Sequence, residues 1–390
     1  MHKQMFIALF LAVFTAMLGM GIVAPLLPLY AQHFGAKGLL IGLVFASFSI
    51  SRTALLPFVG RMSDKRGRKV FIAAGLLLFT LTSLGYVASR NVGELLAARM
   101  LQGIAAAMVI PIALAYMGEL TPAGKEGAYM GVFNIFFFGG LAMGPIMGGI
   151  VKDLFGLDFS FYSMGVASFI GFLFTLIFLP ESKRIREPAA SYLWSLSQVL
   201  AGRRIRGIYL FRLFFSIGIG LTWTFLPIFG DNFLGLSSSH IGILISLNVL
   251  IATLLQTPCG MLADRFNKAA FVIFGGSLAA GALFLIPLTR DFREILFVNI
   301  LLGISGGISM PAVTAMAVEE GKNIGGMGTL MSIFVMCHSI GMIIGPVLAG
   351  AVAGVLNVTF VFFIGALVGL AGVGGFAIFM HRARAFQDPG

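Results

Sequence analysis

Ten consecutive residues, Gly60 to Lys69, hold one acid, Asp64, among five bases. The stretches on either side, residues 39–59 and 70–89, carry a single charge between them. Such a cluster of bases is enough to hold a segment on one side of a membrane. That anchoring does not require an aspartate between two glycines, so Asp64 indicates a specific electrostatic contact.

Other basic side chains lie inside apolar stretches rather than between them. Arg99, three residues before Gln102, must reach the outer interface, find a partner or face water, because an unpaired arginine is costly in a bilayer. Arg52 lies too deep to reach the interface, and both structural pairing and substrate contact are open to it. His338 can carry protons, since its reference pKa is near 6.5, or it can simply pack through a hydrogen bond. Arg212 is expected to be an interfacial anchor.

The acids are distributed differently from these bases. All fifteen lie between the apolar stretches or near their ends. The interior is therefore expected to be cationic, which repels a permanently cationic compound. An anionic, zwitterionic or neutral amphiphilic solute is favoured instead.

Composition excludes several classes of protein. The chain is 58% hydrophobic and 11% charged, which is typical of a polytopic α-helical membrane protein. The net charge of +11 does not indicate a nucleic-acid partner, because the bases lie in short segments between apolar runs. The two cysteines form no disulfide framework, and no zinc-type histidine spacing, nucleophile elbow or phosphate loop is present. We expect no enzymatic activity, metal or cofactor.

The elements that must position these residues are long apolar runs, each about 20 residues or more, as a bilayer requires of a helix. We expect an all-α membrane protein with twelve spans. Their predicted ranges are 6–32, 39–59, 70–89, 94–118, 128–152, 160–180, 207–231, 240–262, 270–289, 294–318, 326–354 and 357–380.

Lysine and arginine decide the expected orientation. With the N-terminus inside, eighteen of them fall in cytoplasmic segments and five on the opposite side. This bias places both termini in the cytoplasm. We expect a monomer in the bilayer of the cell's inner membrane.

The chain divides into two halves that repeat. We predict six-helix bundles at 1–180 and 207–390, joined by a linker at 181–206 that contains either a short amphipathic helix or a flexible segment. Gly60 and Asp64 return as Gly260 and Asp264, Pro111 as Pro311 and Glu119 as Glu319, and Gly144-Pro145 returns as Gly345-Pro346. Such a repeat implies two pseudo-symmetric bundles.

Three motifs resemble one family, the major facilitator superfamily. Gly60, Asp64, Gly67, Arg68 and Lys69 match its pattern between spans 2 and 3, with mild departures at Met62 and Ser63. Two further patterns, in spans 5 and 4, resemble those of its drug:proton antiporter branch. They comprise Gly140, Gly144, Pro145, Gly148 and Gly149 in span 5, and Arg99, Gln102 and Gly103 in span 4.

The resemblance implies alternating access by two bundles around a central site. It implies a gate in which Asp64 lies at the start of span 11 and Arg68 pairs with Glu119. The second copy of this motif has Asn267 where a glycine would be expected and keeps only Arg265 and Lys268 as bases, so we expect a weaker role for it. Arg99 is implicated in proton coupling, and the glycines and prolines of spans 5 and 11 in bending and packing. Candidates for lining the site are Thr15, Asn134, Trp223, Asn248, Gln256 and Asn299, with Arg52, Arg99, Gln102 and His338 as candidates for proton or substrate contact.

The function expected on these grounds is proton-coupled efflux of a small amphiphilic or anionic organic compound. Two alternatives remain open. One is uptake of an organic anion. The other is movement of a lipid-like substrate between leaflets, in which the arginines would hold a head group.

Overall fold

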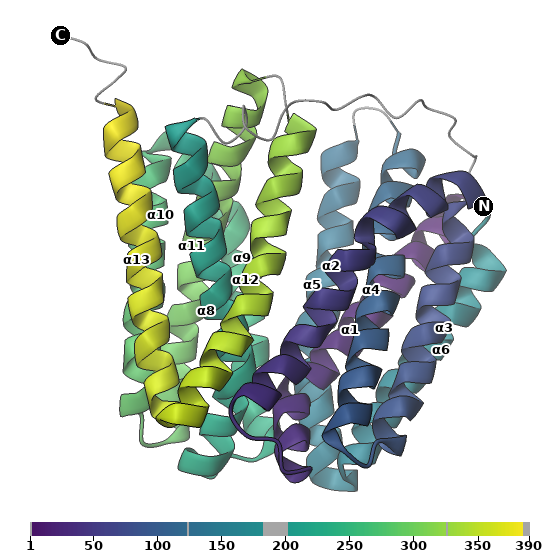
Figure 1. Ribbon diagram of the computed structural model, residues 1–390. Coiled ribbons are helices and arrows are strands. Elements are labelled where there is room, and N and C mark those ends of the chain that lie inside the picture. The colour runs from purple at the N-terminus through teal and green to yellow at the C-terminus, as the bar shows by residue number, and fades with distance from the viewer. Residues whose placement is uncertain (1, 123–124, 182–201, 325–326, 385–390) are drawn as a thin grey trace. The chain divides into compact units, whose positions relative to one another are not determined.

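The computed structural model describes residues 2–122, 125–181, 202–324 and 327–384, and these parts are built of helices without strands (Figure 1). Twelve helices are long and apolar enough to span a membrane, so the predicted fold class is confirmed. The first six are α1 (His2–His33), α2 (Leu39–Arg66), α3 (Arg68–Ala88), α4 (Val92–Leu120), α5 (Glu126–Phe155) and α6 (Leu157–Phe178). The others are α8 (Arg203–Leu234), α9 (Ser238–Arg265), α10 (Lys268–Leu285) with a 3-10 turn η1 (Ile286–Leu288), α11 (Phe292–Asn323), α12 (Met327–Val355) and α13 (Val358–Arg384).

Contacts divide the chain into two compact units. The first is Met1–Pro188 with Pro227–Ser246, and the second is Ala189–Leu226 with Leu247–Gly390. In the first unit α1 packs against α5 and α6, and α4 against α2 and α3. In the second unit α10 packs against α11 and α13. The short helix expected in the linker falls outside the described residues.

The charged stretch between predicted spans 2 and 3 is almost entirely helical. α2 continues to Arg66 and α3 begins at Arg68, so only Gly67 separates the two helices. Gly67 has φ = 103°, a conformation that side-chain-bearing residues rarely adopt, and a Cβ there would collide with the carboxylate of Glu181. The predicted spans stop at residue 59 and resume at residue 70 because charge marks the end of a membrane span and not the end of a helix.

The internal repeat extends to helix caps that sequence reasoning did not single out. Asn91 caps α4 by accepting from the N–H of Glu94, at 3.0 Å, and Asp291 caps α11 by accepting from the N–H of Glu294, at 2.9 Å. Both caps satisfy otherwise unpaired N–H groups at the start of a helix. The two units therefore share details of local structure as well as landmarks in sequence.

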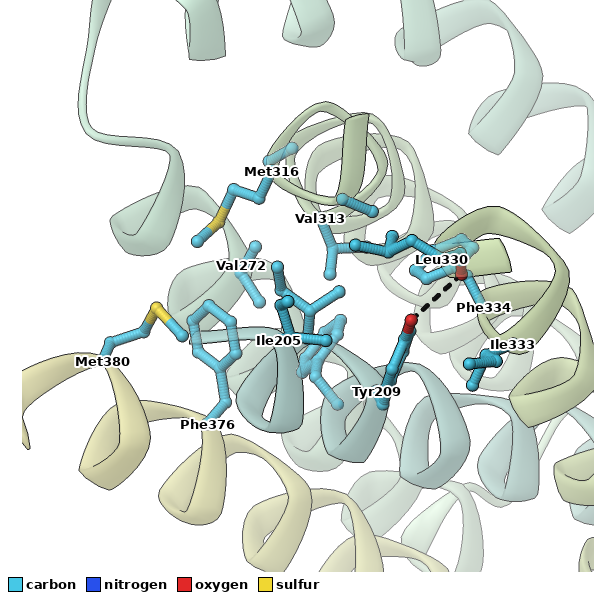
Figure 2. Close-up of a cluster of buried hydrophobic side chains, with 14 of the residues drawn as sticks. Ile205, Tyr209, Val272, Val313, Met316, Leu330, Ile333, Phe334, Phe376 and Met380 are labelled. Carbon is cyan, nitrogen blue, oxygen red and sulfur yellow. Dashed lines mark hydrogen bonds between the residues drawn. The ribbon is translucent and has the colours of Figure 1, made fainter. Parts of the chain in front are cut away.

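A buried apolar cluster joins the helices of the second unit (Figure 2). It includes Ile205 and Phe211 of α8, Leu330 and Phe334 of α12, and residues of α10, α11 and α13. Within it the hydroxyl of Tyr209 donates to the carbonyl oxygen of Leu330 at 3.1 Å. This bond and the surrounding packing fix the register of α8 against α12.

Candidate functional site

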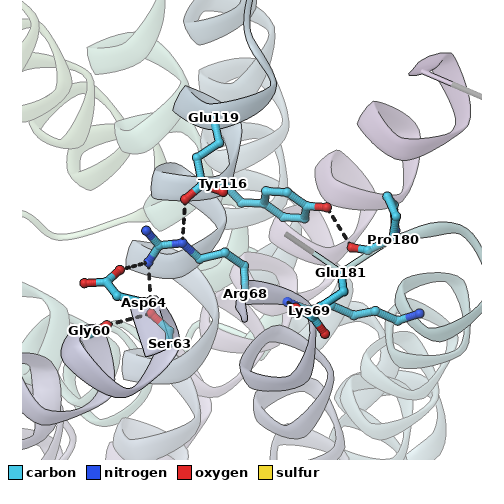
Figure 3. A network of polar contacts seen from close by, with 9 residues as sticks. All are labelled: Gly60, Ser63, Asp64, Arg68, Lys69, Tyr116, Glu119, Pro180 and Glu181. Carbon is cyan, nitrogen blue, oxygen red and sulfur yellow. Dashed lines mark hydrogen bonds and ion pairs between the residues drawn. The ribbon is translucent and has the colours of Figure 1, made fainter. Parts of the chain in front are cut away.

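Arg68 contacts Ser63, Asp64 and Glu119 where the ends of α2, α3 and α4 meet (Figure 3). Its Nη1 lies 2.6 Å from Asp64 Oδ1 and donates to Ser63 Oγ at 2.9 Å, and its Nε lies 2.9 Å from Glu119 Oε1. The Arg68 side chain is only 12% exposed, so its ion pairs are partly shielded from water. The pair with Glu119 expected from the resemblance is present, and Ser63, which had counted as a departure from the motif, belongs to the network. The contact of Asp64 with the start of α12 stays a prediction.

The start of α3 is also tied to the segment that follows α6. The backbone N–H of Lys69 donates to Glu181 Oε1 at 3.1 Å, and the Tyr116 hydroxyl donates to the carbonyl oxygen of Pro180 at 2.7 Å (Figure 3). These contacts hold Arg68 against the end of α4. A Cβ at Gly60, by contrast, would meet nothing within 4 Å among the described atoms, so packing within its own unit does not require glycine there.

The second unit contains a copy of this network, offset by 200 residues. Lys268 Nζ lies 2.8 Å from Glu319 Oε1 and 3.6 Å from Asp264 Oδ1. A lysine ammonium is a point charge and lacks the planar fork with which arginine binds two carboxylates at once. The geometry therefore agrees with the expected weaker role of this copy.

Arg99 is buried inside the first unit, 4% exposed, so it does not extend to the interface. Its Nη1 donates to Gln102 Oε1 at 2.5 Å, and the same oxygen accepts from the Tyr86 hydroxyl at 2.7 Å. The guanidinium carbon lies 5.1 Å and 4.7 Å from the ring centroids of Phe45 and Phe48 on α2. Cation–π contact and one neutral amide therefore take the place of an acidic partner.

Gly103 explains how α2 comes so close to α4. A Cβ at Gly103 would collide with Ser51 Oγ and with the carbonyl oxygen of Phe48. Ser51 Oγ in turn donates to the carbonyl oxygen of Met100 at 2.8 Å. The glycine of the span-4 motif thus brings the aromatic rings of α2 within reach of the guanidinium.

Arg52 is half-buried on α2, and its Nε is enclosed without a hydrogen-bond partner. No ion pair joins it to an acid within the described parts of the chain. Since α2 extends to Arg66, Arg52 lies fourteen residues, or about 21 Å, from the end of its helix. The helix continues past the end of the apolar run, so the depth of Arg52 within the span stays a prediction.

The glycines of α5 let this helix touch α1 backbone to backbone. A Cβ at Gly140 would collide with the carbonyl oxygen of Phe14, and one at Gly144 would lie 2.5 Å from the carbonyl oxygen of Leu18. Pro145 packs at the same seam, where its Cδ would lie 2.9 Å from a Cβ on Gly21. The seam recurs in the second unit, where Gly345 and Pro346 pack against α8. α5 and α12 are continuous helices with the prolines inside them, and the bending attributed to these prolines stays a prediction.

Gly144→Ala is expected to lower the melting temperature of the purified protein, whereas Gly139→Ala in the same helix leaves it nearly unchanged. The alanine at 144 would meet only backbone atoms of α1, which cannot move without shifting the helix, and such overpacking costs about 1–3 kcal/mol. A Cβ at Gly139 has one neighbour, a ring carbon of Phe14 at 4.0 Å. Equal melting temperatures for the two variants would contradict the close backbone packing of α5 against α1 at Gly144.

The candidates for lining a substrate site divide between the two units, with Thr15 and Asn134 in the first and the others in the second. Thr15 is buried against Gly171 of α6 and donates to a carbonyl of its own helix, so its position is that of a packing residue. Asn248 Nδ2 lies 3.4 Å from the carbonyl oxygen of the buried Asn299. These two are the candidate pair that the second unit brings together. Trp223 and Gln256 are half-buried. On α5, Asn134 is exposed, whereas Gly148 of the span-5 motif is buried.

His338 and Arg212 both contact side chains of neighbouring helices within the second unit. His338 Nδ1 lies 2.9 Å from Ser216 Oγ, so a hydrogen-bonded histidine is present on α12. Arg212 was expected to anchor α8 at the interface, and this was wrong. Its Nη1 lies 2.7 Å from the sulfur of Met310 and its guanidinium faces the Phe334 ring, so it points inward.

Asp153 at the end of α5 is the polar contact that sequence reasoning missed. Its carboxylate accepts from the N–H groups of Ser238 and Ser239, at 3.2 and 2.7 Å, and from Ser239 Oγ at 2.6 Å. Lys152 Nζ donates to Ser238 Oγ at 2.6 Å. A carboxylate at the start of α9 is favoured by the helix dipole and by the free N–H groups there. Gly149 leaves room for this contact, because a Cβ there would collide with the carbonyl oxygen of Ser238.

Comparisons with known proteins agree on one family. The profile of the Major Facilitator Superfamily matches residues 9–233 and 208–388. An uncharacterized MFS-type transporter of Methanocaldococcus jannaschii is 30% identical over 365 residues, which cover 92% of this chain and 93% of that protein. Multidrug resistance protein 2 of Bacillus subtilis is 27% identical, with 96% of this chain and 94% of that protein covered. The crystal structure of a point mutant of the nucleoside transporter NupG is 16% identical, with a TM-score of 0.81 and coverage of 96% and 99%.

Proposed function

The chain belongs to the Major Facilitator Superfamily, and on that basis we propose that it is a proton-coupled exporter of a small amphiphilic or anionic organic compound. It is a multi-pass transporter of this superfamily with twelve membrane-spanning helices. The compound that it moves is released chemically unchanged.

The positive charge within the membrane-spanning helices is the observation that supports an anionic or amphiphilic substrate. Arg52, Arg99 and Arg212 lie within spans, and none of them forms an ion pair with an acid in the described chain. The described ion pairs all lie near helix ends. A cationic interior attracts an anion and repels a permanent cation.

Two further observations support export by exchange with protons. The span-5 pattern of the antiporter branch is present, and its glycines place α5 directly against the backbone of α1. A full-length relative is named a multidrug resistance protein. We place both termini in the cytoplasm of a cell whose inner membrane holds the protein, since basic residues are concentrated on that side.

Direction is tested with vesicles of opposite orientation and radiolabelled naphthalene-2-sulfonate, which stays ionised and does not itself follow a pH gradient. Inside-out vesicles with an acidic lumen are expected to accumulate the sulfonate, and a protonophore should abolish the accumulation. Vesicles lacking the protein are the control. Accumulation by right-side-out vesicles in acidic medium instead would show uptake, and flux that ignores the gradient would refute proton coupling.

A further inference from the structure

Arg212 is a cation enclosed by groups that do not neutralise it. Its Nη1 contacts the thioether of Met310, a weak acceptor, and its guanidinium carbon lies 5.0 Å from the Phe334 ring centroid. Its Nε is enclosed and has no hydrogen-bond partner. Part of the residue nevertheless remains accessible.

The acids of the second unit are engaged elsewhere. Among the described residues, Asp264 and Glu319 pair with Lys268, and Glu320 pairs with Arg204. At the start of α11, Asp291 accepts from the backbone N–H of Glu294, and the Glu294 carboxylate accepts from the backbone N–H of Arg290. A charge buried without a partner is strongly unfavourable, so an arginine in this position is poised to bind an anion from outside the chain.

His338 lies one turn further along the same pair of helices. On α8, Arg212 and Ser216 are four residues apart, and so are Phe334 and His338 on α12, so that the two contacts stack one turn apart. Ser216 Oγ donates its proton to the carbonyl oxygen of Arg212 at 2.8 Å. Because a hydroxyl has one proton, His338 Nδ1 must then donate to Ser216 Oγ, which fixes the imidazole in place.

We propose that Arg212 and His338 form a binding site for the oxyanion of the substrate, a carboxylate or sulfonate carried on an aromatic body. The planar guanidinium suits two oxygens of one oxyanion, and the imidazole one turn away adds a polar group. Phe334 and Met310 supply a ring face and a polarizable thioether for the aromatic body. The site rests on the proposed function, since it names the substrate class of that transporter.

The register of α8 against α12 positions this site. The Tyr209–Leu330 bond lies one turn before the Arg212–Phe334 contact, inside the buried cluster of Figure 2. One turn after His338, Gly341 packs so closely that a Cβ would lie 2.6 Å from Ser216 Cβ. Both ends of the site are therefore held by packing, which leaves the guanidinium and imidazole little freedom to separate.

The test is equilibrium binding to the purified full chain in neutral-lipid nanodiscs. The probe is naphthalene-2-sulfonate, compared with the uncharged naphthalene-2-sulfonamide. Wild type should bind the sulfonate more tightly than the sulfonamide, and Arg212→Gln should weaken sulfonate binding by about ten- to a hundredfold while sparing the sulfonamide. His338→Gln should weaken it less. The matched control is Arg204→Gln on the same helix, which removes a partly exposed ion pair with Glu320 near the start of α8.

The melting temperature of the ligand-free protein distinguishes a ligand site from a structural contact. Because Arg212 lacks a neutralising partner, Arg212→Gln should leave the melting temperature of the ligand-free protein unchanged or raise it. Sulfonate binding that survives Arg212→Gln, or equal affinity for the two probes, would overturn the proposal. So would Arg212-dependent stabilisation by added phosphatidylglycerol without any by the sulfonate, because the anion would then be a lipid head group. If sulfonate binding depends on Arg212 but no transport is seen in vesicles, the proposed export function is refuted. The binding site would still be supported.

Discussion

Asp64→Asn is expected to lower the initial rate of transport by at least about tenfold, equivalent to about 1.4 kcal/mol in the barrier. The substitution removes the charge that pairs with Arg68 at 2.6 Å, while the size of the side chain is kept. It also removes the anion that the proposed gate requires at the start of α12. Insertion and folding should be largely intact, because the Asp64 side chain is 52% exposed and Arg68 keeps its bond to Glu119.

The chain contains its own control for this experiment. Asp264 occupies the equivalent position of the second unit but lies 3.6 Å from Lys268 and is 69% exposed. An exposed pair of this kind is worth little, so Asp264→Asn should change the rate by less than about threefold. Transport and surface expression are measured for both variants. Equal reductions of the transport rate by the two substitutions, or normal transport by Asp64→Asn, would contradict a gating role for Asp64.

Arg99→Gln is expected to reduce transport by roughly a hundredfold, which corresponds to the loss of charged hydrogen bonds worth about 3 kcal/mol. The fold should survive, because Gln102 keeps its bond from Tyr86 when the arginine is removed. Arg99→Lys should also be impaired, since an ammonium lacks the planar fork that reaches Gln102 while facing Phe45. Transport rates and melting temperatures are measured together. If Arg99 had a purely structural role, its substitution would lower both.

Arg90→Gln is the control for Arg99. Arg90 is exposed just before α4, and the contact it makes to Glu94 uses its backbone N–H, which the substitution keeps. Its transport rate should equal that of the wild type. If Arg99→Gln transports as well as Arg90→Gln, the buried arginine has no part in coupling or substrate contact.

Much of the fold was predictable because a bilayer imposes a minimum length on apolar helices. The twelve spans and the repeat follow from that length and from residue types at matched offsets, whereas the Arg68–Glu119 pair was implied by the resemblance to the family. Helix ends were less accessible to prediction. The charges of Gly60 to Lys69 mark where the bilayer stops, but α2 continues as a helix to Arg66.

The direction in which a side chain points was the hardest property to predict. Apolar runs in a membrane lack the polar face that distinguishes inside from outside in a soluble helix. Thr15 and Arg212 were therefore misplaced, one as a lining residue and the other as an anchor. Asp153 was missed because its partners, two backbone N–H groups and the Ser239 hydroxyl, lie 85 and 86 residues away in the sequence. The serines at 237–239 before an apolar run were the available signal for a helix start that could accept an anion.

Counterflow in proteoliposomes tests most directly whether the chain is a carrier that alternates its access. Liposomes with purified protein are loaded with unlabelled naphthalene-2-sulfonate and diluted into a trace of labelled compound. For such a carrier, label should accumulate transiently above its equilibrium level, Asp64→Asn should slow this overshoot, and empty liposomes should show none. Label that rises to equilibrium without an overshoot in the wild type would contradict alternating access.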